Sequence, residues 1–217
     1  MNIDFSLAYT KANEMLITNQ SITGFPFSAR KLVEEKTAIR CRSYKSALKY
    51  GVDINDFGSE SAVLMEYQGR SILFFNEAKP ESHANYSILH ELAHYAMKHK
   101  MKNVSKELYE KQELEANYFA AQILMPEQLL RYLQQQGTKI SVSFLTNNFG
   151  VSELAAKKRI ITLGKTNTSW YSNAEKEFDD IILELYVPMI QHLYPRDYYD
   201  FEDEYNMQIK RDSWGLH

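Results

Sequence analysis

A five-residue stretch with two histidines constrains this 217-residue chain more than any other feature. It spans residues 90–94 and has the sequence His-Glu-Leu-Ala-His. Side chains four residues apart lie on one face of an α-helix, so His90 and His94 can reach the same tetrahedral Zn²⁺ ion. Glu91 lies about 100° further round the helix, where it can act on water without binding the metal. The stretch therefore predicts a helix carrying two metal ligands, His90 and His94, and a general base, Glu91.

A catalytic zinc site takes three protein ligands, so the chain must supply one more. Glu115 follows His94 by 21 residues, which leaves room for a turn and an antiparallel helix. Its small and apolar neighbours predict that this helix is buried, and a buried carboxylate favours a cation beside it. We therefore predict Glu115 as the third ligand, with a buried salt bridge as its alternative role. Glu113 is the reserve ligand, because residues two apart on a helix point about 160° away from each other.

The composition is that of an ordinary globular protein, with 44% hydrophobic and 24% charged residues. It predicts one domain, or one domain with a small appendage. No apolar run approaches the roughly 20 residues of a membrane span, and the first residues do not resemble a signal peptide. The single cysteine, Cys41, cannot form an internal disulfide, so we expect a cytoplasmic protein. We interpret Cys41 as a small residue on a helix face rather than as a nucleophile.

The net charge of −3 is unevenly distributed. Residues 172–217 contain eleven Asp or Glu and four Lys or Arg, which gives this end of the chain a net charge of −7. The preceding residues carry +4. An acidic segment of this kind is expected to be a solvated surface, and the alternative is a docking surface for a basic partner.

Periodicity and turn residues predict mostly helices and one hairpin. The hairpin joins strands at 62–67 and 70–75 through Gln68-Gly69. The predicted helices cover residues 4–20, 28–39, 43–50, 83–98, 105–124, 127–136, two short helices within 141–163, and 174–193.

Two blocks of sequence, taken together, resemble the ImmA/IrrE-type metallopeptidases. The first is the aromatic-rich approach to the His-Glu-Leu-Ala-His stretch, residues 85–94, and the second is residues 115–126, EANYFAAQILMP. Ala93 stands where that family often has glycine. The resemblance covers roughly residues 25–165 and implies His90, His94 and Glu115 as metal ligands with Glu91 as the base.

The residues and the resemblance together predict an α+β, zincin-like metallopeptidase. It should have a small sheet of about three strands, an active-site helix and a helical, helix-turn-helix-like C-terminal part. The predicted divisions are a peptidase domain at 1–137, a helix-turn-helix-like subdomain at 138–165 and an acidic helical extension at 166–217.

The resemblance implies a cytoplasmic zinc endopeptidase that cleaves a helix-turn-helix repressor and so derepresses mobile-element or stress genes. Zn²⁺ is the expected metal, and Mn²⁺ suits the same ligands. The substrate is expected to lie as an added strand along the hairpin edge. An alternative function is a non-catalytic regulator that binds and displaces a repressor or antitoxin.

Several further residues have roles that the sequence leaves open. Tyr95, Tyr118 and Arg159 are candidates for the donor that holds the oxyanion. Residues 141–163 have the pattern of a helix-turn-helix, for which we expect a structural role rather than DNA binding. His83 lies on the face of His90, either at the mouth of the site or solvated at the helix start. We interpret the remaining histidines as surface residues: His99, His192 and His217.

Overall fold

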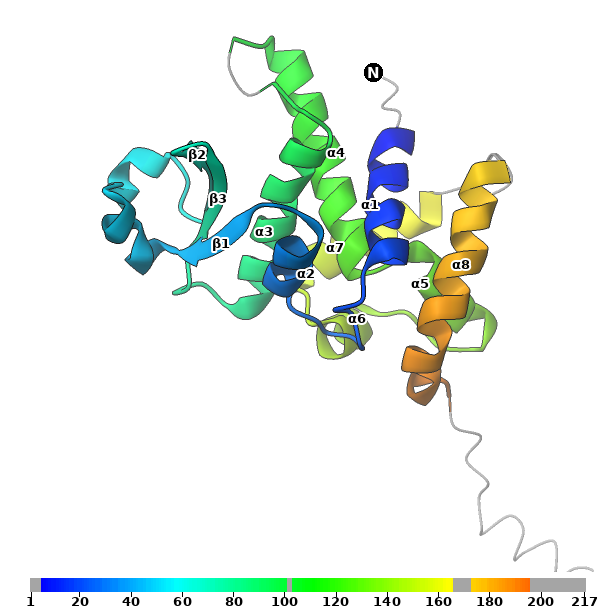
Figure 1. The fold of residues 1–217 in the computed structure, drawn as a ribbon. Coiled ribbons are helices and arrows are strands. Elements are labelled where there is room, and N and C mark those ends of the chain that lie inside the picture. Colours follow the sequence, from blue (N-terminus) through cyan, green and yellow to red (C-terminus); the bar gives the residue numbers. More distant parts are fainter. Residues whose placement is uncertain (1–4, 101–102, 166–172, 196–217) are drawn as a thin grey trace, which may run out of the picture.

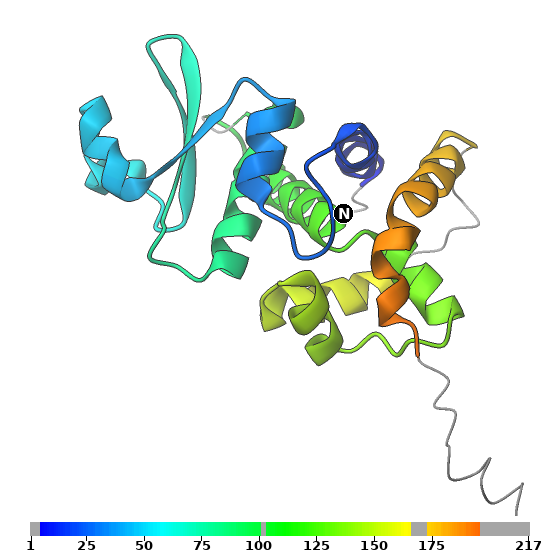
Figure 2. The same ribbon diagram turned by 60° about the horizontal axis from the view of Figure 1, so that its bottom comes forward.

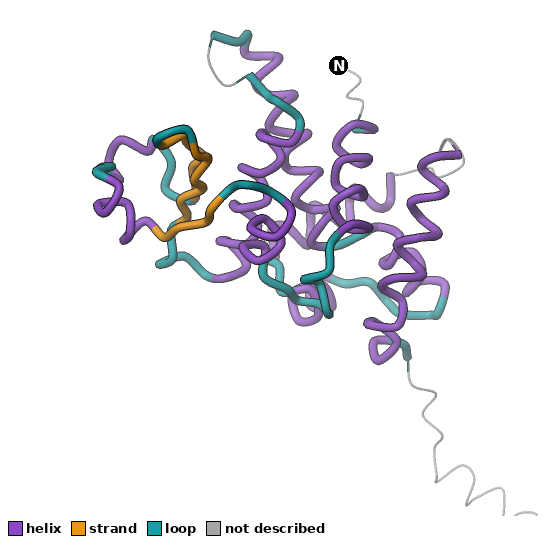
Figure 3. The backbone as a smooth tube through the Cα atoms, in the orientation of Figure 1, coloured by secondary structure: helices purple, strands orange, loops and turns teal. Residues whose placement is uncertain are grey.

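The computed structural model describes residues 5–100, 103–165 and 173–195. In these ranges the chain has a mixed α+β fold, with the strands gathered at one end and helices forming the rest (Figures 1 and 3). This confirms the predicted mixed class and the small sheet. The α-helices are α1 (Ser6–Thr18), α2 (Ala29–Lys36), α3 (Glu81–Ala96), α4 (Lys106–Leu124), α5 (Glu127–Gln135), α6 (Val142–Phe149), α7 (Glu153–Lys165) and α8 (Asn173–Ile190).

The predicted hairpin forms with the predicted bounds. Strands β2 (Ala62–Tyr67) and β3 (Arg70–Phe75) pair antiparallel, with Leu64 opposite Leu73. Gln68 and Gly69 have φ angles of 49° and 72°, as a tight two-residue hairpin turn requires. The sheet order is β1-β3-β2, so β2 is an edge strand.

The third strand is the one that the sequence did not locate. β1 (Arg40–Ser43) pairs parallel with β3, and its sequence of Arg-Cys-Arg-Ser has no apolar alternation to mark it. The prediction that Cys41 lies on a helix is therefore wrong. Cys41 is buried on β1, and desolvation raises the pKa of its thiol to about 12, which agrees with a packing role.

Strand β3 is apolar on both faces because both faces are covered. Leu73 belongs to the main core, whereas Ile72 and Phe74 face a second cluster that includes Tyr44 and Phe57. Two 3₁₀ helices supply these aromatic residues, η1 (Tyr44–Tyr50) and η2 (Ile54–Phe57). The helix predicted at 43–50 is thus a 3₁₀ helix, and it ends at Gly51 in the left-handed conformation, as expected.

Helices α3 and α4 pack side by side in the middle of the molecule (Figure 1). The α4 helix begins at Ser105, whose Oγ accepts a hydrogen bond from the Leu108 N–H at 3.2 Å. It ends at Leu124, just before Pro126, which cannot continue a helix without losing a backbone hydrogen bond. Both helices start and stop within two residues of their predicted bounds.

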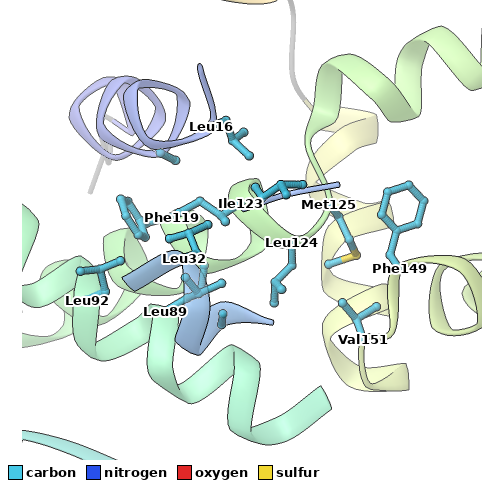
Figure 4. Packing of buried hydrophobic residues seen from close by; sticks show 14 of the residues in the cluster. Leu16, Leu32, Leu89, Leu92, Phe119, Ile123, Leu124, Met125, Phe149 and Val151 are labelled. Atoms are coloured by element: carbon cyan, nitrogen blue, oxygen red, sulfur yellow. The ribbon is translucent and has the colours of Figure 1, made fainter. Parts of the chain in front are cut away.

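The main core joins these two helices to the helices around them (Figure 4). Leu89 and Leu92 of α3 meet Phe119 and Ile123 of α4, and Leu16 of α1 covers the same cluster. All five side chains are at most 1% exposed. Removing a buried aromatic ring such as that of Phe119 typically costs about 3–5 kcal/mol, so this packing holds α3 and α4 firmly relative to each other.

The C-terminal helices pack against the opposite side of the core from the sheet (Figure 2). α6 and α7 are joined at Gly150, which has φ of +63° and lies so close to Pro26 that a Cβ would come within 2.6 Å of its ring. In α8, Tyr186 donates a buried hydrogen bond of 2.7 Å to the Leu16 carbonyl of α1. The helix is followed by the 3₁₀ helix η4 (Gln191–Leu193), so the amphipathic stretch predicted at 174–193 is confirmed as helical.

No helix in the described ranges has the length and apolarity needed to cross a membrane. The predicted acidic extension is described only over residues 173–195, and the acidic, aromatic-rich segment from residue 196 onward lies outside the described residues.

Candidate metal centre

Three side chains from two helices meet at one point. His90 and His94 lie one turn apart on α3, with their Nε2 atoms 3.1 Å from each other. Glu113 of α4 faces both rings, with Oε2 at 3.3 Å from His90 Nε2 and Oε1 at 3.5 Å from His94 Nε2. Among the described residues, these three side chains form a group in which the ligand atoms lie close enough to one another to hold one metal ion.

The spacing of these atoms fits a tetrahedral metal. Bonds of about 2.0–2.1 Å in tetrahedral geometry place neighbouring ligand atoms about 3.3 Å apart. The separations here run from 3.1 to 3.5 Å. Two imidazoles and one carboxylate are also a known donor set of catalytic zinc sites, in which the fourth position stays open. The residues present therefore fit a divalent metal.

Burial keeps both histidines neutral, which is the form that binds metals. Desolvation lowers the pKa of His90, against the opposing effect of the Glu113 charge. Desolvation, with His90 and His99 as further causes, lowers the pKa of His94 to about 3. At neutral pH each ring therefore has a lone pair available to a cation.

The third ligand predicted from the sequence requires a correction. Glu115 does not face His90 and His94; its carboxylate lies 3.2 Å from His99 Nε2 and 3.5 Å from Lys111 Nζ. The reserve candidate, Glu113, occupies the metal-facing position instead. The sequence showed that both glutamates lie on a buried helix, but the rotation of α4 about its axis decides which of them faces α3.

Glu91, the predicted general base, follows His90 on α3 and contacts the sheet. Its Oε2 accepts a hydrogen bond of 3.3 Å from the Leu64 N–H of the edge strand β2. Desolvation raises the pKa of Glu91 to about 7, with the Leu64 N–H acting in the opposite direction and the Glu113 charge adding to the increase. A carboxyl group with a pKa near neutrality can both accept and return a proton, as general acid–base catalysis requires.

This raised pKa predicts how the stability of the metal-free protein depends on pH. Because the folded pKa of Glu91 exceeds its ordinary value of 4.5, the native state binds the extra proton and loses stability as the pH rises from about 4.5 to about 7. Metal-free Glu91→Gln should therefore be more stable than the parent protein by about 3 kcal/mol at pH 8, and equally stable near pH 4. Urea unfolding of both proteins at the two pH values measures the difference. A difference that is independent of pH would show that burial of a charged Glu91 carries no such cost.

Two residues beside the ligands were not predicted. Asn117 hydrogen-bonds with His90, and it accepts a hydrogen bond of 2.9 Å from the Tyr86 hydroxyl through Oδ1. The Tyr109 hydroxyl hydrogen-bonds with Glu113, whose charge raises the pKa of Tyr109. Both residues lie one helical turn from Glu113, and that spacing would have identified them once Glu113 was known to face the two histidines.

The predicted oxyanion donors lie elsewhere. Tyr118 stacks on Phe5 with ring centroids 4.9 Å apart, and Arg159 donates to the Met125 carbonyl at 2.9 Å and to Gln122. Tyr95 is 46% exposed. None of the three has a described contact with His90, His94 or Glu91, whereas Tyr109 adjoins Glu113.

The other histidines divide into surface residues and one exception. His83 is exposed and hydrogen-bonds through Nε2 to Ser61 Oγ at 2.8 Å, and His192 is exposed, as expected. The prediction that His99 lies on the surface is wrong. Its side chain is 6% exposed, and its Nδ1 lies 2.9 Å from His94 Nδ1. His217 lies outside the described residues.

Comparison with known proteins adds one finding. Residues 47–160, just over half of the chain, match the model of the IrrE N-terminal-like domain, the peptidase family M78. The match includes β2, β3, and the whole of α3 and α4 with the three metal-facing residues. Comparison with curated proteins gives no match.

Proposed function

Because the chain belongs to the IrrE N-terminal-like peptidase family, we propose that it is a zinc-dependent endopeptidase. In this proposal His90, His94 and Glu113 hold the metal and Glu91 is the general base. The observation that carries the proposal is the convergence of two neutral imidazoles and a carboxylate, with ligand atoms 3.1–3.5 Å apart, beside a glutamate that contacts an edge strand. Mn²⁺ suits the same ligands and is the alternative metal.

The roles of the side chains follow from their positions. A bound Zn²⁺ supplies Lewis acidity, which polarises a peptide carbonyl and makes water easier to deprotonate. Glu91 takes a proton from the attacking water and then passes it to the leaving amine. The Leu64 N–H holds the Glu91 carboxylate in place throughout. Tyr109, whose hydroxyl lies beside Glu113, replaces the three earlier candidates as the proposed oxyanion donor.

The edge strand beside Glu91 is the proposed substrate site. Only one side of β2 pairs with β3, and the Leu64 N–H on its other side points to Glu91. Backbone groups alternate in direction along a strand, so a substrate strand added next to β2 would run past the Glu91 carboxylate. Pairing of this kind recognises extended backbone and depends little on side chains.

We further propose that the substrate is a helix-turn-helix repressor, that cleavage occurs in the cytoplasm and that the fold is zincin-like. The resemblance to the ImmA/IrrE-type peptidases supports this proposal. The second candidate is a non-catalytic regulator that binds the repressor and displaces it from DNA. The presence of Glu91 as a candidate base beside the proposed metal ligands favours the peptidase over the non-catalytic regulator.

Direct DNA binding by α6 and α7 is not part of the proposal. Lys157 and Lys158 are exposed on α7, but the next basic residue, Arg159, is 1% exposed and donates a hydrogen bond to the buried Met125 carbonyl. The exposed face of α7 also carries Leu154 and Ile161, which do not suit a phosphate-facing surface. We propose that these helices are a packing subdomain.

Co-expression with a candidate helix-turn-helix regulator tests the proposal. The expected result is loss of the full-length regulator with the parent protein and its persistence with Glu91→Gln. Derepression that survives Glu91→Gln, with the regulator intact, would instead support displacement. Retention of the purified protein on duplex DNA, falling steeply with salt, would favour the DNA-binding alternative.

A further inference from the structure

The metal-facing His94 is backed by a second histidine that its sequence spacing does not mark. His94 Nδ1 lies 2.9 Å from His99 Nδ1, and His99 Nε2 lies 3.2 Å from Glu115 Oε2, off the direction of an ideal hydrogen bond. The three side chains are 7%, 6% and 10% exposed. They form a continuous line of polar contacts that leads away from the metal centre.

The chemistry of imidazole determines where the protons lie along this line. A neutral imidazole has one N–H and one lone pair. If His94 Nε2 binds a metal, its proton is on Nδ1, so His94 donates to His99 Nδ1. The His99 proton is then on Nε2, facing the Glu115 carboxylate. This arrangement gives the 2.9 Å contact between the two Nδ1 atoms one donor and one acceptor, and it turns the His99 N–H, not a lone pair, towards the carboxylate.

The backbone around His99 is anchored on both sides. Lys98 has φ of +55°, an uncommon value for a residue other than glycine, and the His99 N–H donates to the His94 carbonyl at 2.9 Å. Gln112 of α4 then accepts from the Lys100 N–H and donates to the Lys100 carbonyl, both at 2.8 Å. The left-handed turn at Lys98, which ends α3, and this double hydrogen bond hold the His99 ring between His94 and Glu115.

We propose that His99 and Glu115 are positioning residues that set the tautomer of His94 and strengthen its bond to the metal. The inference rests on the proposed function only in requiring that His90, His94 and Glu113 bind a divalent metal. An N–H of a ligating histidine that is held by a hydrogen-bonded partner fixes the ring and raises its basicity. Glu115, the ligand predicted from the sequence, thus acts on the metal through two histidines instead of by direct contact.

The test measures Zn²⁺ affinity of the full chain, prepared metal-free, by competition with a chromophoric chelator. Loss of outer partners of this kind typically weakens metal binding about 10–100-fold, so we expect His99→Phe and Glu115→Gln to fall in that range. His99→Gln should retain most of the affinity, because its amide can accept from His94 and donate to Glu115. The matched control is Glu110→Gln, because Glu110 is an exposed carboxylate on the same helix that pairs with Lys106.

A second readout separates positioning from general destabilisation. Nitrogen-15 NMR of the imidazole rings in the metal-free proteins should show His94 with its proton on Nδ1 in the parent protein and a mixture of tautomers in His99→Phe. Wild-type Zn²⁺ affinity in both His99→Phe and Glu115→Gln would overturn this inference but leave the proposed function standing. An unchanged His94 tautomer in His99→Phe would do the same. Failure of the parent protein to bind Zn²⁺ would overturn the proposed function as well.

Discussion

Replacement of Glu91 by Gln is expected to lower peptide-bond cleavage about 10²–10⁴-fold while the zinc content stays at the parent level. Gln cannot accept the proton from water, but its amide oxygen can still accept the hydrogen bond from the Leu64 N–H. Glu91 is also outside the group of ligand atoms formed by His90, His94 and Glu113. The variant therefore removes the base without removing the metal ligands.

The measurement is digestion of a proteome-derived peptide mixture by the zinc-loaded proteins, with new termini counted by mass spectrometry. Glu153→Gln is the matched control, because Glu153 is an exposed carboxylate that pairs with Lys157 on α7. Cleavage by Glu91→Gln at the parent rate would contradict the role of Glu91 as the general base. If the parent protein itself produces no new termini, the non-catalytic regulator is the better-supported hypothesis.

Glu113→Gln is expected to weaken Zn²⁺ binding about 100-fold or more. Zinc sites with four ligands bind with about 10–16 kcal/mol, so one ligand contributes about 3 kcal/mol, and 1.4 kcal/mol corresponds to a factor of ten in affinity. Gln keeps the shape of the side chain but removes the negative charge that lies 3.3–3.5 Å from the two imidazoles. The same chelator competition used for the outer residues measures the change.

Comparison with Glu115→Gln makes this result decisive. The two substitutions are chemically identical and lie two residues apart on α4. The structure predicts that Glu113→Gln has the larger effect, because Glu115 contacts His99 and Lys111 instead of the two ligating rings. The opposite order, with Glu115→Gln losing more affinity, would restore the ligand set that the family resemblance implies.

Short-range patterns predicted much of this protein. The hairpin at Gln68-Gly69 formed in the expected register because a two-residue turn leaves few alternatives. The long helices began and ended near the expected residues because caps and Pro126 act locally. The strand β1 was not located, since a short parallel strand with one buried residue has no periodicity of its own.

Within the candidate site, the sequence alone determined the residues that share a helical turn. His90, Glu91 and His94 keep their relative positions in any α-helix, so their spacing is enough to predict two ligands and a base. Only the tertiary structure decided their partners. Packing around Phe119 sets the rotation of α4 and turns Glu113 towards the two rings. The left-handed turn at Lys98 after α3 places His99 behind His94. Rotation about a helix axis and the path of the chain after a helix depend on contacts between distant segments, which spacing along one segment does not contain.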